Sequence, residues 1–466
     1  MTSAFDEGRP PKVGMVSLGC AKNLVDAEVM LGDAVSRGFE VTADAEEADV
    51  LVVNTCGFIE SAKQESIEAI LEARRRPDQK LVVSGCLTQR YRDQLARELP
   101  EVDAFIGLDQ VATAGEIFRG VVAAESRVPR LLISPRSRYV PDYDTPRFRL
   151  TPAHTAYVKI AEGCNHPCSF CVIPQMRGRH RSRSIESVAA EVRNLVAEGV
   201  KEVNLISQDT TYFGMDWWVQ KAGPRQPVDS LRGPTLVQLL DELAMIEGEF
   251  WVRLLYTHPA HWSGELIAAI ARNPKVARYV DMPLQHIDGA MLAAMRRETS
   301  REHIEDLISR LRSGIPGLAI RTTFIVGFPG ETEEHFLSLL DFIETARFER
   351  LGIFTYSQEE GSRAARLPGQ VPVRVKNARQ RETMKVQQRI AAELAAARKG
   401  ATLRVLVDQP RIARSEHDAP DVDCRVILSR NAPVGEFIDA QVIGSHVYDL
   451  LAEPTIDSGP SSESGR

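Results

Sequence analysis

The sequence predicts an α/β protein in three parts: an N-terminal parallel α/β domain, a central partial barrel of six βα units, and a small five-stranded C-terminal β-barrel of the oligonucleotide-binding type. Three observations support this prediction. Apolar runs alternate with amphipathic helical patterns near the N-terminus. The same alternation resumes after a stretch rich in Pro and Arg, and the last part of the chain has the pattern of short strands.

Length and composition limit the possible classes of protein. The chain has 466 residues, enough for about three domains, and 43% of them are apolar. It has no run of 18 apolar residues, and its first residues carry charges and prolines where a secretory signal would be apolar, so we expect a soluble, cytoplasmic protein with no membrane partner. The net charge of −7 means that a nucleic-acid site would have to be a local patch. Seven cysteines in a reducing compartment favour metal binding or catalysis over disulfides.

The predicted N-terminal domain, residues 11–122, has three apolar, β-rich runs that end at Cys20, Cys56 and Cys86. Each run precedes a helical pattern, and the spacings of 36 and 30 residues match one strand-helix unit. Strands covered by helices on both faces are continuously apolar, as these are. A single cysteine at a strand end is usually a small buried residue. Three of them at the carboxyl edge of one parallel sheet converge on the place where such sheets bind ligands, which predicts a metal centre.

The remaining divisions follow from changes in pattern. Residues 123–150 have little periodicity and are predicted to be a linker. Residues 151–382 contain six strand-helix repeats, too few for a closed eight-unit barrel, so an open or partial barrel is expected. A polar helix over 376–399 precedes the strands of the small barrel, which we assign to residues 385–454. The ending, 455–466, has the composition of a disordered tail.

A second group of cysteines lies in one loop after the first strand of the central domain. Cys164, Cys168 and Cys171 are too close in sequence to be buried separately as small apolar residues, so they indicate a metal site. Zinc would need a fourth ligand, for which His166 is near but poorly placed. Ordinary iron-sulfur clusters take four cysteines, and three thiolates would leave one iron open to a substrate. An iron-sulfur cluster is the preferred interpretation, and zinc is the alternative.

Other strand ends carry candidate cofactor-binding residues. One strand ends in a Gly-Phe-Pro-Gly turn that opens a helix, where glycines allow a ligand to approach the backbone. A plain βα turn is the structural alternative. Two further strands end in Gln-Asp and in Gln-His, although a single histidine such as His286 is more often structural. The predicted cofactor-binding set is Gly327, Gly330, Glu331, Gln208 and Asp209.

The spacing Cys164-x3-Cys168-x2-Cys171 after the first strand of a parallel barrel resembles that of the radical S-adenosylmethionine superfamily. With the second cysteine triplet, the order of domains and the terminal barrel, the chain resembles the methylthiotransferase family from about Lys12 to Pro454. The resemblance implies that the barrel is a substrate-binding TRAM domain. It also implies two 4Fe-4S clusters, one on each triplet, with S-adenosylmethionine as radical source and methyl donor. The cluster of Cys20, Cys56 and Cys86 would hold or supply the sulfur.

Four further stretches are similar to one branch of that family, which methylthiolates the β-carbon of an aspartate in small-subunit ribosomal protein twelve. They are residues 18–26, 173–178, 283–286 and 354–362. The alternative is the same chemistry on a tRNA adenosine, and a third possibility is a non-catalytic iron-sulfur or zinc protein of translation. The sequence does not identify the sulfur donor or the electron donor.

Charge and loop length add three expectations. Residues 399–454 carry six basic and nine acidic side chains, a balance of −3, whereas a module that holds tRNA should be basic. We therefore expect the acidic cluster (Glu416, Asp418, Asp421 and Asp423) to attract a cationic protein, with surface solvation as the alternative. The basic run 177–183 could bind ribosomal RNA or a substrate carboxylate, or order a loop through ion pairs. The loop 214–227, with Trp217 and Trp218, could be a lid, an oligomer contact or a local core.

Overall fold

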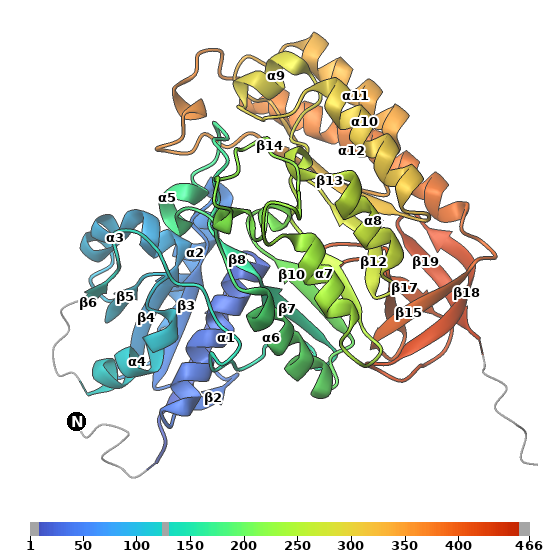
Figure 1. Cartoon of the computed structure of the whole chain (residues 1–466). Coiled ribbons are helices and arrows are strands. Elements are labelled where there is room, and N and C mark those ends of the chain that lie inside the picture. The colour runs from blue at the N-terminus through green and yellow to red at the C-terminus, as the bar shows by residue number, and fades with distance from the viewer. Residues whose placement is uncertain (1–8, 124–129, 456–466) are drawn as a thin grey trace, which may run out of the picture.

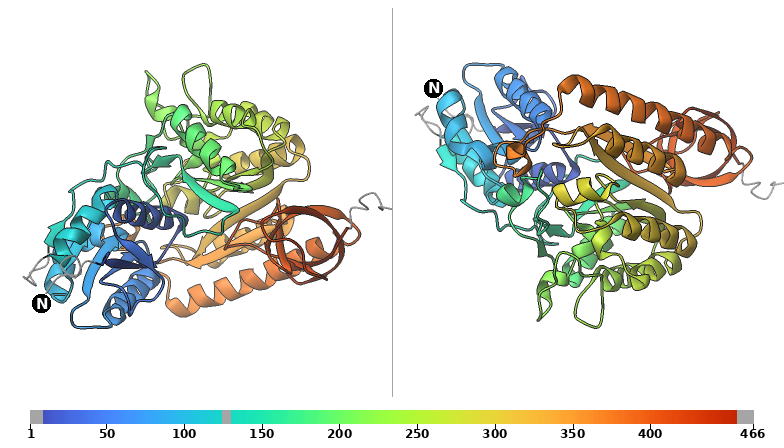
Figure 2. Two further views of the ribbon diagram at one scale, coloured as in Figure 1. Left: turned by 90° about the horizontal axis from the view of Figure 1, so that it is seen from below. Right: turned by 90° about the horizontal axis from the view of Figure 1, so that it is seen from above.

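The computed structural model describes residues 9–123 and 130–455 and contains three adjoining domains (Figure 1). The N-terminal domain and the C-terminal barrel lie on different sides of the central sheet, and a long helix runs beside the central domain to the barrel (Figure 2). The predicted fold class is confirmed. In the part of the chain that the structure describes, no helix is both long and apolar enough to cross a membrane.

The N-terminal domain is a six-stranded parallel sheet with the strand order β2-β1-β3-β4-β5-β6. Every residue of β3 is buried, as its continuous apolar pattern predicts. The three predicted strands are β1 (Lys12–Ser17), β3 (Val50–Thr55) and β4 (Lys80–Gly85). The flanking helices are α1 (Ala21–Ser36), α2 (Glu60–Ala73), α3 (Cys86–Glu98), η1 (Val111–Thr113) and α4 (Ala114–Val122).

Three short strands of this sheet were not predicted: β2 (Glu40–Thr42), β5 (Ala104–Ile106) and β6 (Arg130–Leu132). Each has three residues, which is too few to show a periodicity. Strand β6 lies in the segment predicted as a linker, and it pairs with β5 at the edge of the sheet. This part of the linker segment therefore extends the N-terminal sheet.

The central domain is an open, parallel six-stranded sheet with the order β14-β13-β12-β11-β10-β7, which confirms the predicted partial barrel. Its strands are β7 (Thr155–Lys159), β10 (Glu202–Ile206), β11 (Trp251–Leu254), β12 (Val276–Asp281), β13 (Ala319–Val326) and β14 (Arg350–Thr355). A two-stranded sheet, β8 (Ala161–Glu162) and β9 (Arg181–Ser182), brackets the cysteine loop. The α-helices are α5 (Ile173–Arg177), α6 (Ile185–Ala197), α7 (Leu236–Ala244), α8 (Gly264–Arg272), α9 (Gly289–Ala294), α10 (Arg301–Gly314) and α11 (Glu333–Ala346). Short 3-10 turns are η2 (Thr210–Tyr212), η3 (Met215–Trp217), η4 (Pro259–His261) and η5 (Ala364–Arg366).

Helix α12 (Val373–Ala396) connects the central domain to a closed five-stranded barrel with the order β15-β16-β17-β19-β18. The barrel strands are β15 (Thr402–Gln409), β16 (Ile412–Ser415), β17 (Val426–Leu428), β18 (Phe437–His446) and β19 (Asp449–Pro454). This confirms the predicted small barrel. The predicted tail beyond residue 455 lies outside the described residues.

The acidic loop between β16 and β17 packs against the central sheet. Asp418 pairs with Arg350, and Asp423 accepts a hydrogen bond of 2.6 Å from the Tyr279 hydroxyl. Both carboxylates are buried, and Asp421 accepts a hydrogen bond from the Tyr157 hydroxyl. The expectation that this cluster is free to attract a cationic partner is therefore wrong for Asp418 and Asp423, whose charges are engaged by the central domain. Asp421 is exposed and Glu416 is partly exposed, so for these two residues it stays a prediction.

Candidate cluster and cofactor site

The structure brings together the three N-terminal cysteines at the carboxyl edge of their sheet. Cys20 caps α1, Cys56 follows β3, and Cys86 begins α3 directly after β4. Gly19 has a positive φ of 93°, and a side chain there would lie 2.9 Å from the Cys56 Cβ and 3.3 Å from its Sγ. Glycine at this position thus permits the Cys20 and Cys56 loops to approach each other.

The electrostatic surroundings of these thiols differ. Burial raises the pKa of Cys86 to about 12, although Arg177 donates a hydrogen bond of 3.3 Å from Nε to its Sγ. Burial also raises the pKa of Cys20, but Lys22 and Arg177 lower it by more, so its pKa is lowered overall. Cationic side chains beside a thiol stabilise the thiolate, which is the form that binds a metal.

The second triplet lies in the loop between β8 and α5. The Cys171 amide donates to the Cys168 carbonyl, and the Ile173 amide points at the Cys171 Sγ from 3.4 Å. Arg297 donates from Nη1 to the Cys168 Sγ at 3.6 Å. Burial raises the pKa of Cys171 to about 12, with a further contribution from Cys168. The predicted grouping of these three thiols in one loop is what the structure shows.

Helix α5 separates the two triplets. It begins two residues after Cys171, and Cys86 packs against Val172 and Met176 in a small apolar cluster. The N-terminal cysteine site and the central cysteine loop therefore meet at one interface.

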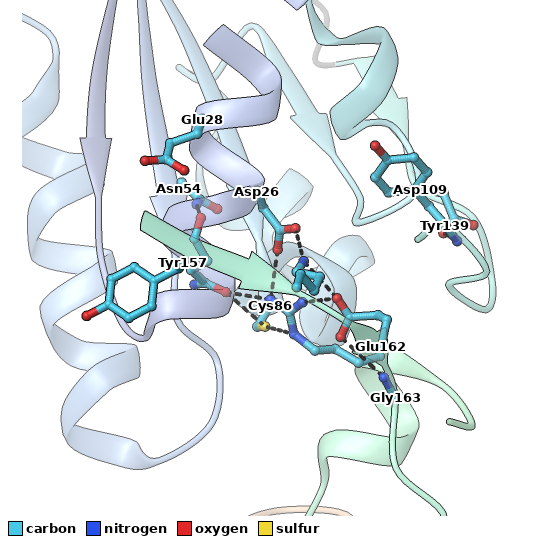
Figure 3. Close-up of polar contacts among 12 residues, drawn as sticks. Asp26, Glu28, Asn54, Cys86, Asp109, Tyr139, Tyr157, Glu162 and Gly163 are labelled. Carbon is cyan, nitrogen blue, oxygen red and sulfur yellow. Dashed lines mark hydrogen bonds and ion pairs between the residues drawn. The ribbon is translucent and has the colours of Figure 1, made fainter. Parts of the chain in front are cut away.

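A buried polar network joins the two sides of this interface (Figure 3). Arg177 donates to Glu162 at 2.8 Å and to Asp26 at 3.0 Å, and it also donates to the Asn23 side chain at 2.6 Å. Lys159 pairs with the same two carboxylates. Asp26 and Asn23 belong to α1, whereas Glu162 immediately precedes the cysteine loop, so the network ties the loop to the N-terminal domain.

The basic run 177–183 contributes several arginines to this network and to other local ion pairs and hydrogen bonds. Arg177 is buried in ion pairs, and Arg183 pairs with Glu191. Arg181 donates to main-chain carbonyls of the same run. These three arginines therefore order the loop, whereas Arg179 is exposed.

Two of the predicted cofactor-binding residues, Gln208 and Asp209, brace the cysteine loop. The Gln208 side chain accepts a hydrogen bond of 2.7 Å from the Gly163 amide and donates to Glu162. Asp209 accepts a hydrogen bond of 2.7 Å from His166, inside the loop. Burial raises the pKa of Asp209, but His261 and His166 lower it by more.

The glycine turn after β13 is held by its own neighbours. Gly327 has a φ of 73°, and a side chain there would collide with Lys376 of α12. Glu331 accepts a hydrogen bond of 2.6 Å from the Gly327 amide and pairs with Arg379 at 2.5 Å. A side chain at Gly330 would meet no atom within 4 Å, so this part of the turn is open. A cofactor role for these three residues stays a prediction.

The sequence did not reveal a buried histidine cluster next to the cysteine loop. The ring nitrogens of His166, His258 and His261 lie within 4.8 Å of one another, and the His166 ring stacks on His258 at 3.7 Å. Burial lowers the pKa of His166, but hydrogen bonds to Asp209 and Glu298 raise it to about 9. His258 and His261 are three residues apart in a turn, a spacing that could have drawn attention to them.

The loop 214–227 forms a local core and one wall of a cavity. Trp218 is buried and donates to the Pro234 carbonyl at 3.0 Å, whereas Trp217 is 46% exposed. The cavity has a volume of about 460 Å³, and its lining includes Cys164, Tyr212 and Lys221. The local-core interpretation of this loop therefore holds for Trp218.

Three family models match successive parts of the chain. They are the uncharacterized protein family UPF0004 over residues 12–107, the radical SAM superfamily over 158–343 and the TRAM domain over 400–455. A solved structure of the radical S-adenosylmethionine methyltransferase TsrM from Kitasatospora setae has a similar fold, with a TM-score of 0.53 at 16% identity. The structural match covers 73% of this chain and 72% of the TsrM chain.

Curated relatives match almost the whole chain. A protein of Opitutus terrae named "Ribosomal protein uS12 methylthiotransferase RimO" is 59% identical over 95% of this chain and 96% of its own length. A protein of the same name from Akkermansia muciniphila is 53% identical over 95% of this chain and its own full length. The chain therefore belongs to the RimO family of radical S-adenosylmethionine methylthiotransferases.

Proposed function

We propose that this protein attaches a methylthio group to the β-carbon of an aspartate in ribosomal protein uS12. The observation that carries the proposal is the near full-length identity to relatives named for that substrate, up to 59%. The −3 balance of the barrel is a weaker argument against the tRNA alternative, because the structure directs several of those charges to the central domain.

The two cysteine triplets fit the clusters that this function requires. A 4Fe-4S cluster has four irons, so three thiolates leave one iron without a protein ligand. Each triplet also has a guanidinium that donates to sulfur, Arg177 at Cys86 and Arg297 at Cys168, and such donors stabilise anionic cluster sulfur. We assign the radical-generating cluster to Cys164, Cys168 and Cys171. The second cluster is assigned to Cys20, Cys56 and Cys86.

When bound, the reduced cluster and S-adenosylmethionine supply a carbon radical that removes hydrogen from a carbon too weakly acidic for acid-base catalysis. The chain's own residues position the parts of the site. Glu162, Gln208 and the Asp209–His166 pair hold the cysteine loop, and Arg177 sets that loop against α1. Gly327, Gly330, Glu331, Gln208 and Asp209 are proposed to line the cofactor.

The apolar cluster around Cys86 serves to keep water from the interface between the triplets. Val172 and Met176 are fully buried there, and Phe58 and Ile173 pack beside them. Exclusion of water prevents side reactions of a reactive radical.

The test is anaerobic incubation of the iron-loaded protein with S-adenosylmethionine, a sulfide source, a reductant and either purified uS12 or tRNA. We expect the mass of uS12 to rise by one methylthio group minus one hydrogen, with fragmentation placing the change on an aspartate. The Cys164→Ala protein is the control, for which no product is expected. Methylthiolated tRNA with unmodified uS12 would overturn the proposal.

A further inference from the structure

Lys22 is a buried cation at the interface between the N-terminal domain and the mouth of the central barrel. It lies two residues after Cys20 in the first turn of α1, and only 7% of it is exposed. Its Nζ lies 2.9 Å from the centroid of the Tyr256 ring, just beyond the end of β11. Within residues 9–123 and 130–455, this ammonium forms no ion pair and donates no hydrogen bond.

The neighbouring cations differ from Lys22 because each of them has a carboxylate partner. Lys159 and Arg177 each pair with Asp26 and Glu162, and Arg321 pairs with Asp281 at 2.9 Å. A buried charge is costly unless it is paired, because burial removes its hydration. The face of an aromatic ring compensates only part of that cost. The charge of Lys22 also stabilises the Cys20 thiolate, but no carboxylate of the described residues pairs with the ammonium, so it can take a further anion.

The ring beneath this ammonium is held in position by a strained backbone. Tyr256 has a φ of 62°, in the left-handed region that bulky residues rarely adopt. Its amide donates to the Asp281 side chain at 3.0 Å, and the Thr257 amide donates to the Asp281 carbonyl at 2.8 Å. Strain of this kind persists where the surrounding structure enforces it, and it is concentrated at functional sites.

The ammonium has the donors needed for a carboxylate. A lysine carries three N–H groups in a compact point charge, and contact with one aromatic face leaves N–H groups for a ligand on the other side. The strained backbone of Tyr256 directly beside an unpaired cation indicates a binding site rather than packing alone.

We propose that Lys22 binds the side-chain carboxylate of the substrate aspartate and so selects an acidic side chain. This inference rests on the proposed function. The carbon to be modified is bonded directly to the carboxylate carbon, so an ion pair at Lys22 limits where that carbon can lie. An uncharged side chain of the same shape would leave the buried ammonium unpaired and would bind less well.

The test compares two ligands, uS12 and a uS12 variant in which the target aspartate is asparagine, for equilibrium binding to the iron-loaded enzyme. We expect the unaltered enzyme to bind the aspartate form about 10- to 100-fold more tightly, the range for one charge-assisted hydrogen bond. Lys22→Met should bind both forms equally, and Lys22→Arg should recover part of the preference. Lys385→Met, which removes an exposed lysine of α12, is the matched control and should keep the full preference.

Three results would count against the inference or its basis. Full preference in Lys22→Met would overturn it. An altered electron paramagnetic resonance signal of the N-terminal cluster with unchanged preference would show that Lys22 only balances the charge at Cys20. Failure of the unaltered enzyme to bind either form of uS12 would instead contradict the proposed function. If the Lys22→Met variant loses its iron, the Lys22→Arg variant is the test. Because arginine keeps the positive charge, this variant should still prefer the aspartate form of uS12, and an equal affinity for both forms would overturn the inference.

Discussion

At the scale of single residues, the Cys86 thiol shows how one side chain relates the two cysteine sites. It begins α3 in the N-terminal domain, yet it packs on Val172 and Met176 and accepts a hydrogen bond from Arg177, all three of the central domain. The two sites are thus chemically separate and physically adjacent. Substitutions at the cysteines should separate the two functions.

The first prediction concerns the two triplets. Anaerobically reconstituted protein should hold about eight irons, two 4Fe-4S units. Replacing Cys164, Cys168 and Cys171 by Ala should halve the iron and abolish formation of deoxyadenosine. Replacing Cys20, Cys56 and Cys86 should also halve the iron but leave deoxyadenosine formation in place while methylthio product is lost. Iron analysis and chromatography check this. Equal loss of both activities in folded protein would indicate a single composite site.

The second prediction concerns Arg177. Arg177→Met leaves Asp26 and Glu162 with one cation, Lys159, instead of two. Removing one partner of a buried ion pair costs about 3 to 5 kcal/mol, so the thermal midpoint should fall by several degrees. The control is Arg389→Met, an exposed residue whose pairs with Glu344 and Glu393 are screened by water and contribute little to stability. Equal midpoints for the two variants would contradict a stabilising role for the network.

Residue types and spacing predicted much of the site, but not all of it. The six cysteines could be predicted because thiols at strand ends or bunched in one loop have few structural uses. The contact between Lys22 and Tyr256 could not, since the two residues are 234 positions apart, and the stretch 18–26 that contains Lys22 gives no sign of its partner. Glu331 pairs with Arg379 and with His286. The sequence could not predict these pairs, because side-chain pairing between separate elements leaves no local pattern.

At the scale of elements, the long buried strands were predictable and the loop between β16 and β17 was not. Strand β3 is buried along its whole length and begins with four apolar residues, because helices cover both faces of this parallel sheet. The acidic loop was interpreted by its charge alone. Its partners, Tyr157, Tyr279 and Arg350, lie on three strands of another domain, and a count of charges contains no information about them.

The third prediction concerns Asp418 in this loop. Burial raises the pKa of Asp418, but Arg350 and Ser415 lower it by more, so its folded pKa lies below the unfolded value of about 3.9. Its contribution to stability is therefore fully present above the unfolded pKa and is lost as the pH falls through the folded pKa. The difference in thermal midpoint between unaltered protein and Asp418→Asn should be constant from about pH 7 to 5 and shrink below about pH 4. A difference that grows with acidity would contradict the pairing.

At the scale of the whole molecule, the C-terminal barrel is a structural part of the central domain as well as a candidate substrate-binding module. The side chains of Arg253, Tyr279 and Arg350, on three central strands, end on the barrel's acidic loop. Helix α12 runs alongside the central domain before it enters the barrel (Figure 2). Removal of the barrel should therefore affect more than substrate binding.

The fourth prediction is that a chain ending at residue 399 is less stable than the full chain, because buried arginines and tyrosines of the central sheet lose their carboxylate partners. Its thermal midpoint should fall, and its central domain should be cleaved faster by a protease. A matched surface change, Glu453→Gln, removes one exposed charge of the barrel and should leave both measurements unaltered. A truncated chain as stable as the full one would show that the barrel is only a binding module.

The most direct test of the account is the mass of ribosomal protein uS12 from cells that contain this gene and from cells in which it is deleted. The deleted cells are also complemented either with the unaltered chain or with the Cys56→Ala chain. The fifth prediction is that uS12 carries one methylthio group on an aspartate only where the unaltered chain is present. Modified uS12 in deleted cells that lack the unaltered chain, or unmodified uS12 in cells that contain it, would contradict the account.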